Sequence, residues 1–152
     1  MAKQSAGLLL YRRYNNEIEI FLVHPGGPLW TKKDMGAWSI PKGEFDEEDP
    51  LLAAKREFHE ETGIPAPQGE YIPLMAVQQK GGKVVRAWAI AGEVDAELII
   101  SNKFEMEWPP RSGKKQSFPE IDRAAWFSVE EARQKINPRQ VKLIQELLEK
   151  LY

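Results

Sequence analysis

The residues best suited to chemistry are three neighbouring glutamates, Glu57, Glu60 and Glu61. On an α-helix, residues three and four positions apart share a face, with Cβ atoms roughly 5–6 Å apart. Like charges placed so close repel one another, and the last turn of a helix disfavours negative charge further. A hard divalent cation such as Mg²⁺ or Mn²⁺ removes this repulsion when it binds the carboxylate oxygens. The competing interpretation is a solvated helix face whose acids pair with basic neighbours such as Lys55 and Arg56.

A helix that carries these acids is marked at both of its ends. Asp49 followed by Pro50 is typical of a helix start, because Asp caps the first N–H groups and Pro fits the first helical position. Gly63 is typical of a helix end. We therefore predict a helix over residues 50–62.

The predicted helix has an acidic face and an apolar face. At about 100° per residue, the three glutamates and Ala53 project to one side. Leu51 and Phe58 project to another side, where they can pack on a sheet. Because Ala53 is small, we expect the acidic face to form a shallow, open groove.

Residues 56–64, REFHEETGI, resemble the core of the Nudix box, whose pattern is G-x5-E-x7-R-E-U-x-E-E-x-G-U, with U a bulky apolar residue. Seven residues separate Glu48 from Arg56, as the pattern requires, and Gly43 supplies the opening glycine. Four residues separate Gly43 from Glu48, where the pattern has five. This deletion lies before the predicted helix, so it leaves the glutamates in register and can shift only the loop around Gly43.

The resemblance covers the whole chain, including the segments WSIPKG (38–43) and PEIDRAAWF (119–127). Within the family, the sequence resembles a bacterial subgroup of predicted NTP pyrophosphohydrolases. The resemblance implies an α/β (α+β) fold, the Nudix-type α/β/α sandwich, in which helices cover both faces of a mixed β-sheet. It also implies hydrolysis of a nucleoside diphosphate linked to another group X, with NTPs or dinucleoside polyphosphates as expected substrates. The alternative is a non-catalytic nucleotide-sensing protein of the same fold, although such proteins often lose the box acids.

Carried over to this chain, the resemblance assigns metal binding to Glu57, Glu60 and Glu61, with Mg²⁺ (or Mn²⁺) as the expected cofactor. The backbone carbonyl of Lys42 is expected to add a further ligand. Arg56 would orient Glu57 and balance its charge.

The resemblance leaves the general base open. Family members use either a box glutamate, here Glu57 or Glu60, or a glutamate from a later loop. Glu120 is the candidate from the later loop, because it lies just ahead of a predicted strand. Glu105 and Glu107 compete with it for this role, with weaker support. The alternative for Glu120 is a solvated loop acid.

The candidates for substrate binding outside the box are Lys42, Arg86, Trp108 and Arg111. Trp108 and Arg111 combine an aromatic ring, which can stack on a base, with a cation, which can bind phosphate. The alternative for them is a core tryptophan beside a solvated basic side chain. Lys42 adjoins the acidic cluster and either contacts phosphate or balances charge. Arg86 and Trp88 lie two residues apart, so they share one side of the predicted strand. Burial of Trp88 in the sheet is a simpler explanation for this pair than substrate binding.

The predicted elements follow the order strands, helix, strands, helices, which favours a mixed sheet with helices against it in a single domain over residues 1–152. Alternating apolar residues, turn residues and helix caps predict these elements. Their ranges are a hairpin of 5–13 and 17–24, a short strand 37–41, a polar loop 42–48, a hairpin of 71–80 and 83–94 across Gly81-Gly82, an irregular segment 101–120, a strand 123–128, and helices 129–136 and 139–152.

Composition excludes several classes of function. The sequence has no cysteine, so it contains no disulfide, thiolate metal site or cysteine nucleophile. The formal net charge is −2, so the sequence does not indicate a basic surface for binding nucleic acid or an anionic membrane. Apolar runs are too short for a signal peptide or a membrane span. We expect a cytoplasmic enzyme that binds a small-molecule nucleotide, without nucleic-acid or membrane partners, and leave open a homodimer formed through the C-terminal helix.

Overall fold

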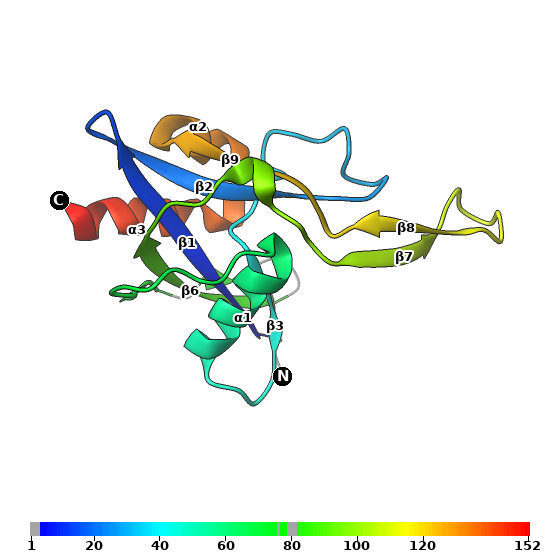
Figure 1. Ribbon diagram of the computed structural model, residues 1–152, viewed down its shortest axis with the longest axis horizontal. Helices are drawn as coiled ribbons and strands as arrows, with labels where there is room; N and C mark the ends of the chain where they lie inside the picture. The colour runs from blue at the N-terminus through cyan, green and yellow to red at the C-terminus, as the bar shows by residue number, and fades with distance from the viewer. Residues whose placement is uncertain (1–3, 76, 79–81) are drawn as a thin grey trace.

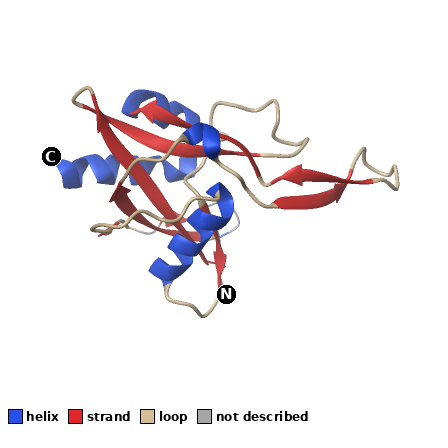
Figure 2. Cartoon of the chain, in the orientation of Figure 1, coloured by secondary structure: helices blue, strands red, loops and turns tan. Residues whose placement is uncertain are grey.

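The computed structural model describes residues 4–75, 77–78 and 82–152. Figure 1 shows a sheet with helices on both sides, and Figure 2 separates the helices from the strands by colour. In chain order the elements are β1 (Gln4–Tyr14), β2 (Glu17–Pro25), β3 (Lys42–Phe45), α1 (Pro50–Thr62), β4 (Ile72–Pro73), β5 (Val77–Gln78), β6 (Val84–Ala91), the 3₁₀ turn η2 (Ala96–Leu98), β7 (Lys103–Glu107), β8 (Lys115–Pro119), β9 (Ile121–Ser128), α2 (Val129–Lys135), the 3₁₀ turn η3 (Pro138–Gln140) and α3 (Val141–Leu151).

Strand β1 is the centre of the main sheet. The sheet has seven strands in the described part of the chain, ordered β4-β6-β1-β2-β9, with β3 paired to β1 and β5 paired to β6. β1 and β6 run parallel, whereas the other pairs are antiparallel. The mixed sheet predicted from the order of elements is therefore confirmed.

Alternation along β1 divides the core into two layers. Leu8 and Leu10 face α1 and lie in one buried cluster with its Phe58. Leu9 faces the opposite side and lies in a second buried cluster with Leu143 of α3. Because successive residues of a strand point to opposite faces, one strand contributes to both layers. This arrangement confirms the predicted α/β/α sandwich.

Two predictions near the acidic helix are wrong in detail. Residues 42–45, predicted to lie in a polar loop, form strand β3 and pair with the first residues of β1. β2 pairs with the later part of β1, so β3 satisfies backbone groups that β1 would otherwise leave open. Residues 37–41, predicted as a strand, form isolated bridges instead, from Trp38 to Ile136 and from Ser39 to β2.

Residues 101–120, predicted to be irregular, contain a separate two-stranded antiparallel sheet of β7 and β8. This β7–β8 arm projects from the body of the molecule (Figure 1). Phe104 and Met106 alternate with exposed residues along β7, and the centroid of the Phe104 ring lies 6.0 Å from that of Phe118 on β8. The two adjacent prolines that follow β7 obscure this alternation in the sequence, but they lie in the turn, where they interrupt no strand pairing.

The C-terminal helices α2 and α3 form as predicted, and Asn137 caps the turn η3 between them. β4 and β5 both pair with β6, in keeping with the second predicted hairpin. The turn predicted for that hairpin lies partly outside the described residues. None of the described helices has the length and apolar character needed to span a bilayer.

Candidate active site

Helix α1 is fixed on the sheet so that its acids lie beside β3. The Asp49 side chain accepts a hydrogen bond of 3.1 Å from the Leu52 N–H. Gly63 ends the helix in the left-handed conformation, with a φ of 76°. Ala53 and Phe58 are fully buried against the sheet. A helix that is capped at both ends and packed along one face holds its carboxylates in defined positions.

The carboxylate of Glu57 lies directly against the backbone of Gly43 in β3. A Cβ atom at residue 43 would lie 2.0 Å from Glu57 Oε2, so glycine is what allows this approach. The Glu57 side chain is only 12% exposed. Burial, together with the nearby charge of Glu60, raises the pKa of Glu57. The expected shallow, open groove is therefore wrong, because Ala53 packs into the core and turns this part of the acidic face toward β3.

We expect Gly43→Ala to lower kcat about tenfold or more and to change the free energy of unfolding by less than about 1 kcal/mol. The new methyl group meets the end of a flexible side chain, so Glu57 can swing away while the fold persists. Hydrolysis rates and thermal melting curves measure the two effects. A variant with wild-type kcat would show that hydrolysis does not depend on the close contact between the Glu57 carboxylate and residue 43.

Glu61 is partly buried and faces residue 42. Its Oε1 accepts a hydrogen bond of 3.0 Å from the Lys42 N–H. Burial raises the pKa of Glu61 to about 8, against the opposing effects of that hydrogen bond and of the Lys42 amine. Burial also lowers the pKa of the Lys42 amine. The structure thus brings Lys42 to the acidic cluster through its N–H, and the proposed metal-binding role of its carbonyl stays a prediction.

Arg56 contacts two of the three box glutamates. Its Nη1 donates to Glu57 Oε1 at 2.8 Å and to Glu60 Oε1 at 3.1 Å. Its Nη2 donates to Glu48 Oε1 at 2.5 Å, and this hydrogen bond is the largest contribution to the raised pKa of the guanidinium. These contacts are those of a residue that orients Glu57 and balances the charge of the cluster.

The donor atoms of the cluster suit a hard divalent cation. Glu57, Glu60 and Glu61 offer the carboxylate oxygens that Mg²⁺ and Mn²⁺ prefer. Within the described ranges, however, no three acidic or histidine side chains converge as they would around a metal ion. The contacts explain this, because Arg56 holds Glu57 and Glu60 while Glu61 accepts the Lys42 N–H. Joint binding of one cation by the three carboxylates therefore requires their side chains to move closer together than they lie here.

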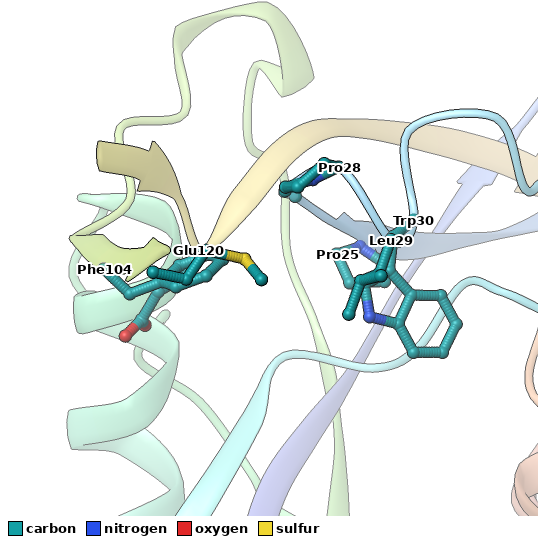
Figure 3. Close-up of a pocket in the computed structure, with 9 residues that line it drawn as sticks. Pro25, Pro28, Leu29, Trp30, Phe104 and Glu120 are labelled. Carbon is teal, nitrogen blue, oxygen red and sulfur yellow. The ribbon is translucent and has the colours of Figure 1, made fainter. Parts of the chain in front are cut away.

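Glu120 lies between two adjoining cavities. The smaller cavity, of about 170 Å³, has Lys42, Glu61 and Glu120 in its lining. The larger cavity, of about 400 Å³, lies between the loop after β2 and strand β7 (Figure 3). The Glu120 N–H donates to the Asn102 carbonyl at 2.8 Å, and its carbonyl accepts from the Gly26 N–H at 2.9 Å. The backbone that carries this carboxylate is therefore fixed from both sides.

Of the three candidates for a base from a later loop, Glu120 is the one that the structure places beside the box. Its charge contributes to the raised pKa values of Glu57 and Glu61. Glu105 and Glu107 are exposed on β7. The choice between Glu120 and a box glutamate stays a prediction.

The structure does not bring Trp108 and Arg111 to the box. Both residues lie in the turn between β7 and β8, at the end of the arm that points away from α1 (Figure 1). Arg111 is exposed and has a positive φ of 62°. The sequence predicts an irregular segment here, whereas two paired strands carry its tip outward.

Arg86 lies nearer to the box. It is exposed on β6, and the sheet register places it in one row with Ala6 of β1 and Gly43 of β3. Residues paired across neighbouring strands point to the same face, so Arg86 projects toward the face that α1 covers. Two strand spacings, roughly 10 Å, separate the backbones of Arg86 and Gly43. Its role in substrate binding stays a prediction.

The larger cavity, which we call the apolar cleft, is lined mostly by residues that sequence reasoning missed. In Figure 3, Pro28, Leu29 and Trp30 lie on one side and Phe104 lies with Glu120 on the other. The available signal was the spacing of Phe104 and Met106, because alternate residues of a strand share a face. The lining consists of Pro25, Gly26, Gly27, Pro28, Leu29, Trp30, Phe104, Met106 and Glu120.

A buried histidine ties the loop of the apolar cleft to the sheet. His24 Nδ1 lies 2.8 Å from Asp122 Oδ1 of β9, and His24 Nε2 lies 2.6 Å from the Lys33 carbonyl oxygen. The loop also folds back on itself, since the Trp30 N–H donates to the Gly27 carbonyl at 3.1 Å. The wall of the cleft is therefore an ordered part of the fold.

Comparison with known protein families supports the assignment that the box residues suggest. The model of the NUDIX domain matches residues 2–147, which is almost the whole chain. Among curated proteins, none matches the chain.

Several solved structures share the fold. An Ap4A hydrolase from C. elegans, in a binary complex, has a TM-score of 0.64 and 24% identity, with 99% of this chain and 98% of that chain covered. The NUDIX domain of Shewanella oneidensis NrtR, in complex with ADP ribose, has a TM-score of 0.68 and 15% identity, with 100% and 90% covered. A MutT structure from work on Aliivibrio salmonicida and Vibrio cholerae has a TM-score of 0.58 and 13% identity, with 97% and 96% covered. The chain therefore belongs to the Nudix family and is a hydrolase that acts on acid anhydrides in phosphorus-containing compounds.

Proposed function

We propose that this chain is a divalent-metal-dependent pyrophosphohydrolase that cleaves a phosphoanhydride bond in a nucleoside diphosphate linked to a group X, with NTPs or dinucleoside polyphosphates as substrates. The observation that carries this proposal is the acidic face of α1, whose Glu61 lines a cavity together with Lys42 and Glu120. A polyphosphate brings several negative charges to the site. The site must therefore supply positive charge as well as a base that activates water.

The residues around this cavity have distinct tasks in the proposed reaction. A bound Mg²⁺ or Mn²⁺ ion, held by Glu57, Glu60 and Glu61, would neutralise phosphate charge and polarise the attacking water. Lys42 donates a hydrogen bond to a phosphate oxygen. Glu120 accepts the proton that the attacking water loses.

The similar structures support a nucleotide as the substrate. One of them is an Ap4A hydrolase, and another is bound to ADP ribose. Both compounds are nucleotides that contain phosphoanhydride bonds. A nucleotide-sensing protein without turnover is the alternative. The presence of Glu57, Glu60 and Glu61 together disfavours it, because a sensor has no need for three repelling carboxylates.

We expect Glu120→Gln to lower kcat about 10²-fold on the substrate that the wild type hydrolyses best, because the amide cannot accept a proton from water. The measurement is release of phosphate or pyrophosphate from NTPs, ADP-ribose and diadenosine polyphosphates with Mg²⁺ or Mn²⁺. Glu130→Gln, on the exposed side of α2, is the control and should keep wild-type kcat.

Two outcomes would contradict these assignments. Absence of turnover on every compound of the panel would remove the catalytic proposal and favour the sensor. A loss of kcat in Glu105→Gln rather than in Glu120→Gln would move the base to the β7–β8 arm.

A further inference from the structure

We propose that the apolar cleft binds the nucleobase of the substrate by stacking and accepts all four bases with similar affinity. This inference rests on the proposed function, because it takes the substrate beside the box to be a nucleotide. It adds the part of the site that receives the nucleoside. It also means that the enzyme selects its substrate by the phosphate chain and not by the base.

The apolar cleft adjoins the cavity at the box. Pro25 and Glu120 line both of them. A molecule that spans the two cavities has one end near Lys42 and Glu61 and the other end among apolar side chains. A nucleotide is divided in this way, with charged phosphates at one end and a flat ring with apolar faces at the other.

The walls of the apolar cleft suit a flat aromatic ring. Trp30 and Phe104 contribute aromatic side chains from opposite sides (Figure 3), and Met106 adds a polarisable thioether. The volume of about 400 Å³ lies within the range of small-molecule sites. Stacking on an aromatic side chain favours every base, because each base has a π-face.

The apolar cleft is preformed. A Cβ atom at Gly27 would lie 2.8 Å from the Phe104 ring, so the loop and the ring are in direct contact. Phe104 also lies near Phe118 on the neighbouring strand. His24 of β2 contacts both the Lys33 carbonyl of the loop and Asp122 of β9, and so holds the loop to the sheet. A cleft shaped by its own packing loses little conformational entropy when a ligand enters.

The lining offers few groups that read the edge of a base. Of the described residues around the apolar cleft, Glu120 alone has an ionisable side chain, and the others are Pro, Gly, Leu, Trp, Phe and Met. Glu120 serves the phosphate side in the proposed reaction. Strong discrimination among bases requires hydrogen-bonding groups aimed at the atoms that distinguish them. Stacking without such groups therefore gives similar affinity for the four bases.

The test compares Trp30→Leu with the wild type on ATP, GTP, CTP and UTP, and on inorganic triphosphate, which has no base. Trp30 is 40% exposed, so its replacement leaves the core untouched. We expect KM to rise about 5- to 50-fold for all four nucleotides with little change in kcat, and the constants for triphosphate to stay the same. The four wild-type kcat/KM values should agree within about tenfold. Tyr152→Leu removes an exposed aromatic ring elsewhere and should change none of these values.

Unchanged KM values in Trp30→Leu would overturn the proposal, as would a wild-type preference of more than about 100-fold for one base. A rise in KM from Trp108→Leu instead would place stacking at the turn of the β7–β8 arm. If the wild type hydrolyses no compound, the proposed function fails separately. Calorimetric titration with the four nucleoside monophosphates, without metal, then decides: binding that Trp30→Leu weakens supports the apolar cleft, and absence of binding overturns it.

Discussion

Glu61→Gln is expected to lower kcat at least about 10³-fold in the presence of Mg²⁺ while leaving the fold intact. A neutral amide is a weaker ligand than a carboxylate for a hard cation, so the acidic face loses part of its metal affinity. Gln keeps the shape of Glu and an oxygen that can accept the Lys42 N–H, which lies 3.0 Å from Glu61 Oε1. Hydrolysis rates and circular dichroism spectra measure the two effects.

Glu149→Gln is the matched control for this substitution. Glu149 lies in the last turn of α3, as Glu61 lies in the last turn of α1, but it is exposed to solvent. It should keep wild-type kcat. A Glu61→Gln enzyme with kcat within about tenfold of the wild type would remove Glu61 from the metal site. Calorimetric titration with Mg²⁺ separates lost metal binding from a defect in a later step.

The parts of the fold that the sequence predicts well have signals within their own segments. Helix α1 has its cap at Asp49 and its stop at Gly63, and both act on neighbouring residues. Strand β3, with the sequence KGEF, has no such signal. It becomes a strand because β1 presents unpaired backbone groups there, and that partner lies far away in the sequence. The β7–β8 arm was missed because its prolines suggested an irregular segment.

The same distinction holds for the candidate site. Glu57, Glu60 and Glu61 share a face of any helix, so their spacing alone predicts the cluster. The contact between Glu57 and Gly43 depends on the packing of α1 against β3, which no local pattern reveals. The apolar cleft is built from the loop after β2 and from β7, and its two walls meet only in the folded chain.

Without metal, we expect the free energy of unfolding to fall as pH rises from about 5 to about 8.5, and Glu61→Gln to remove much of this fall. Burial raises the pKa of Glu61 to about 8, from the ordinary value of 4.5. Between these two values the folded protein keeps a proton that the unfolded chain has released, so rising pH favours unfolding. This contribution to stability is fully present below about pH 4.5 and is lost above about pH 8.

The expected difference between the two proteins is on the order of 3 kcal/mol at the alkaline end. For a chain of this length, that corresponds to roughly 6–12 °C in Tm. Burial also raises the pKa of Glu57, which adds to the fall, and lowers the pKa of Lys42, which opposes it. Comparison of wild type with Glu61→Gln isolates the contribution of Glu61. Chemical denaturation with a chelator present measures it, and parallel pH dependences for the two proteins would contradict it.

Saturating Mg²⁺ should remove most of this difference between the two proteins at alkaline pH. A cation bound at the carboxylate of Glu61 takes the place of the proton, and binding to the folded state adds about 2.7 kcal/mol when the free metal exceeds its Kd 100-fold. The wild type should gain this stability, whereas Glu61→Gln should gain little. One substitution is thus expected to stabilise the metal-free protein and to abolish its activity, because the buried charge that destabilises the fold is the charge that binds the metal.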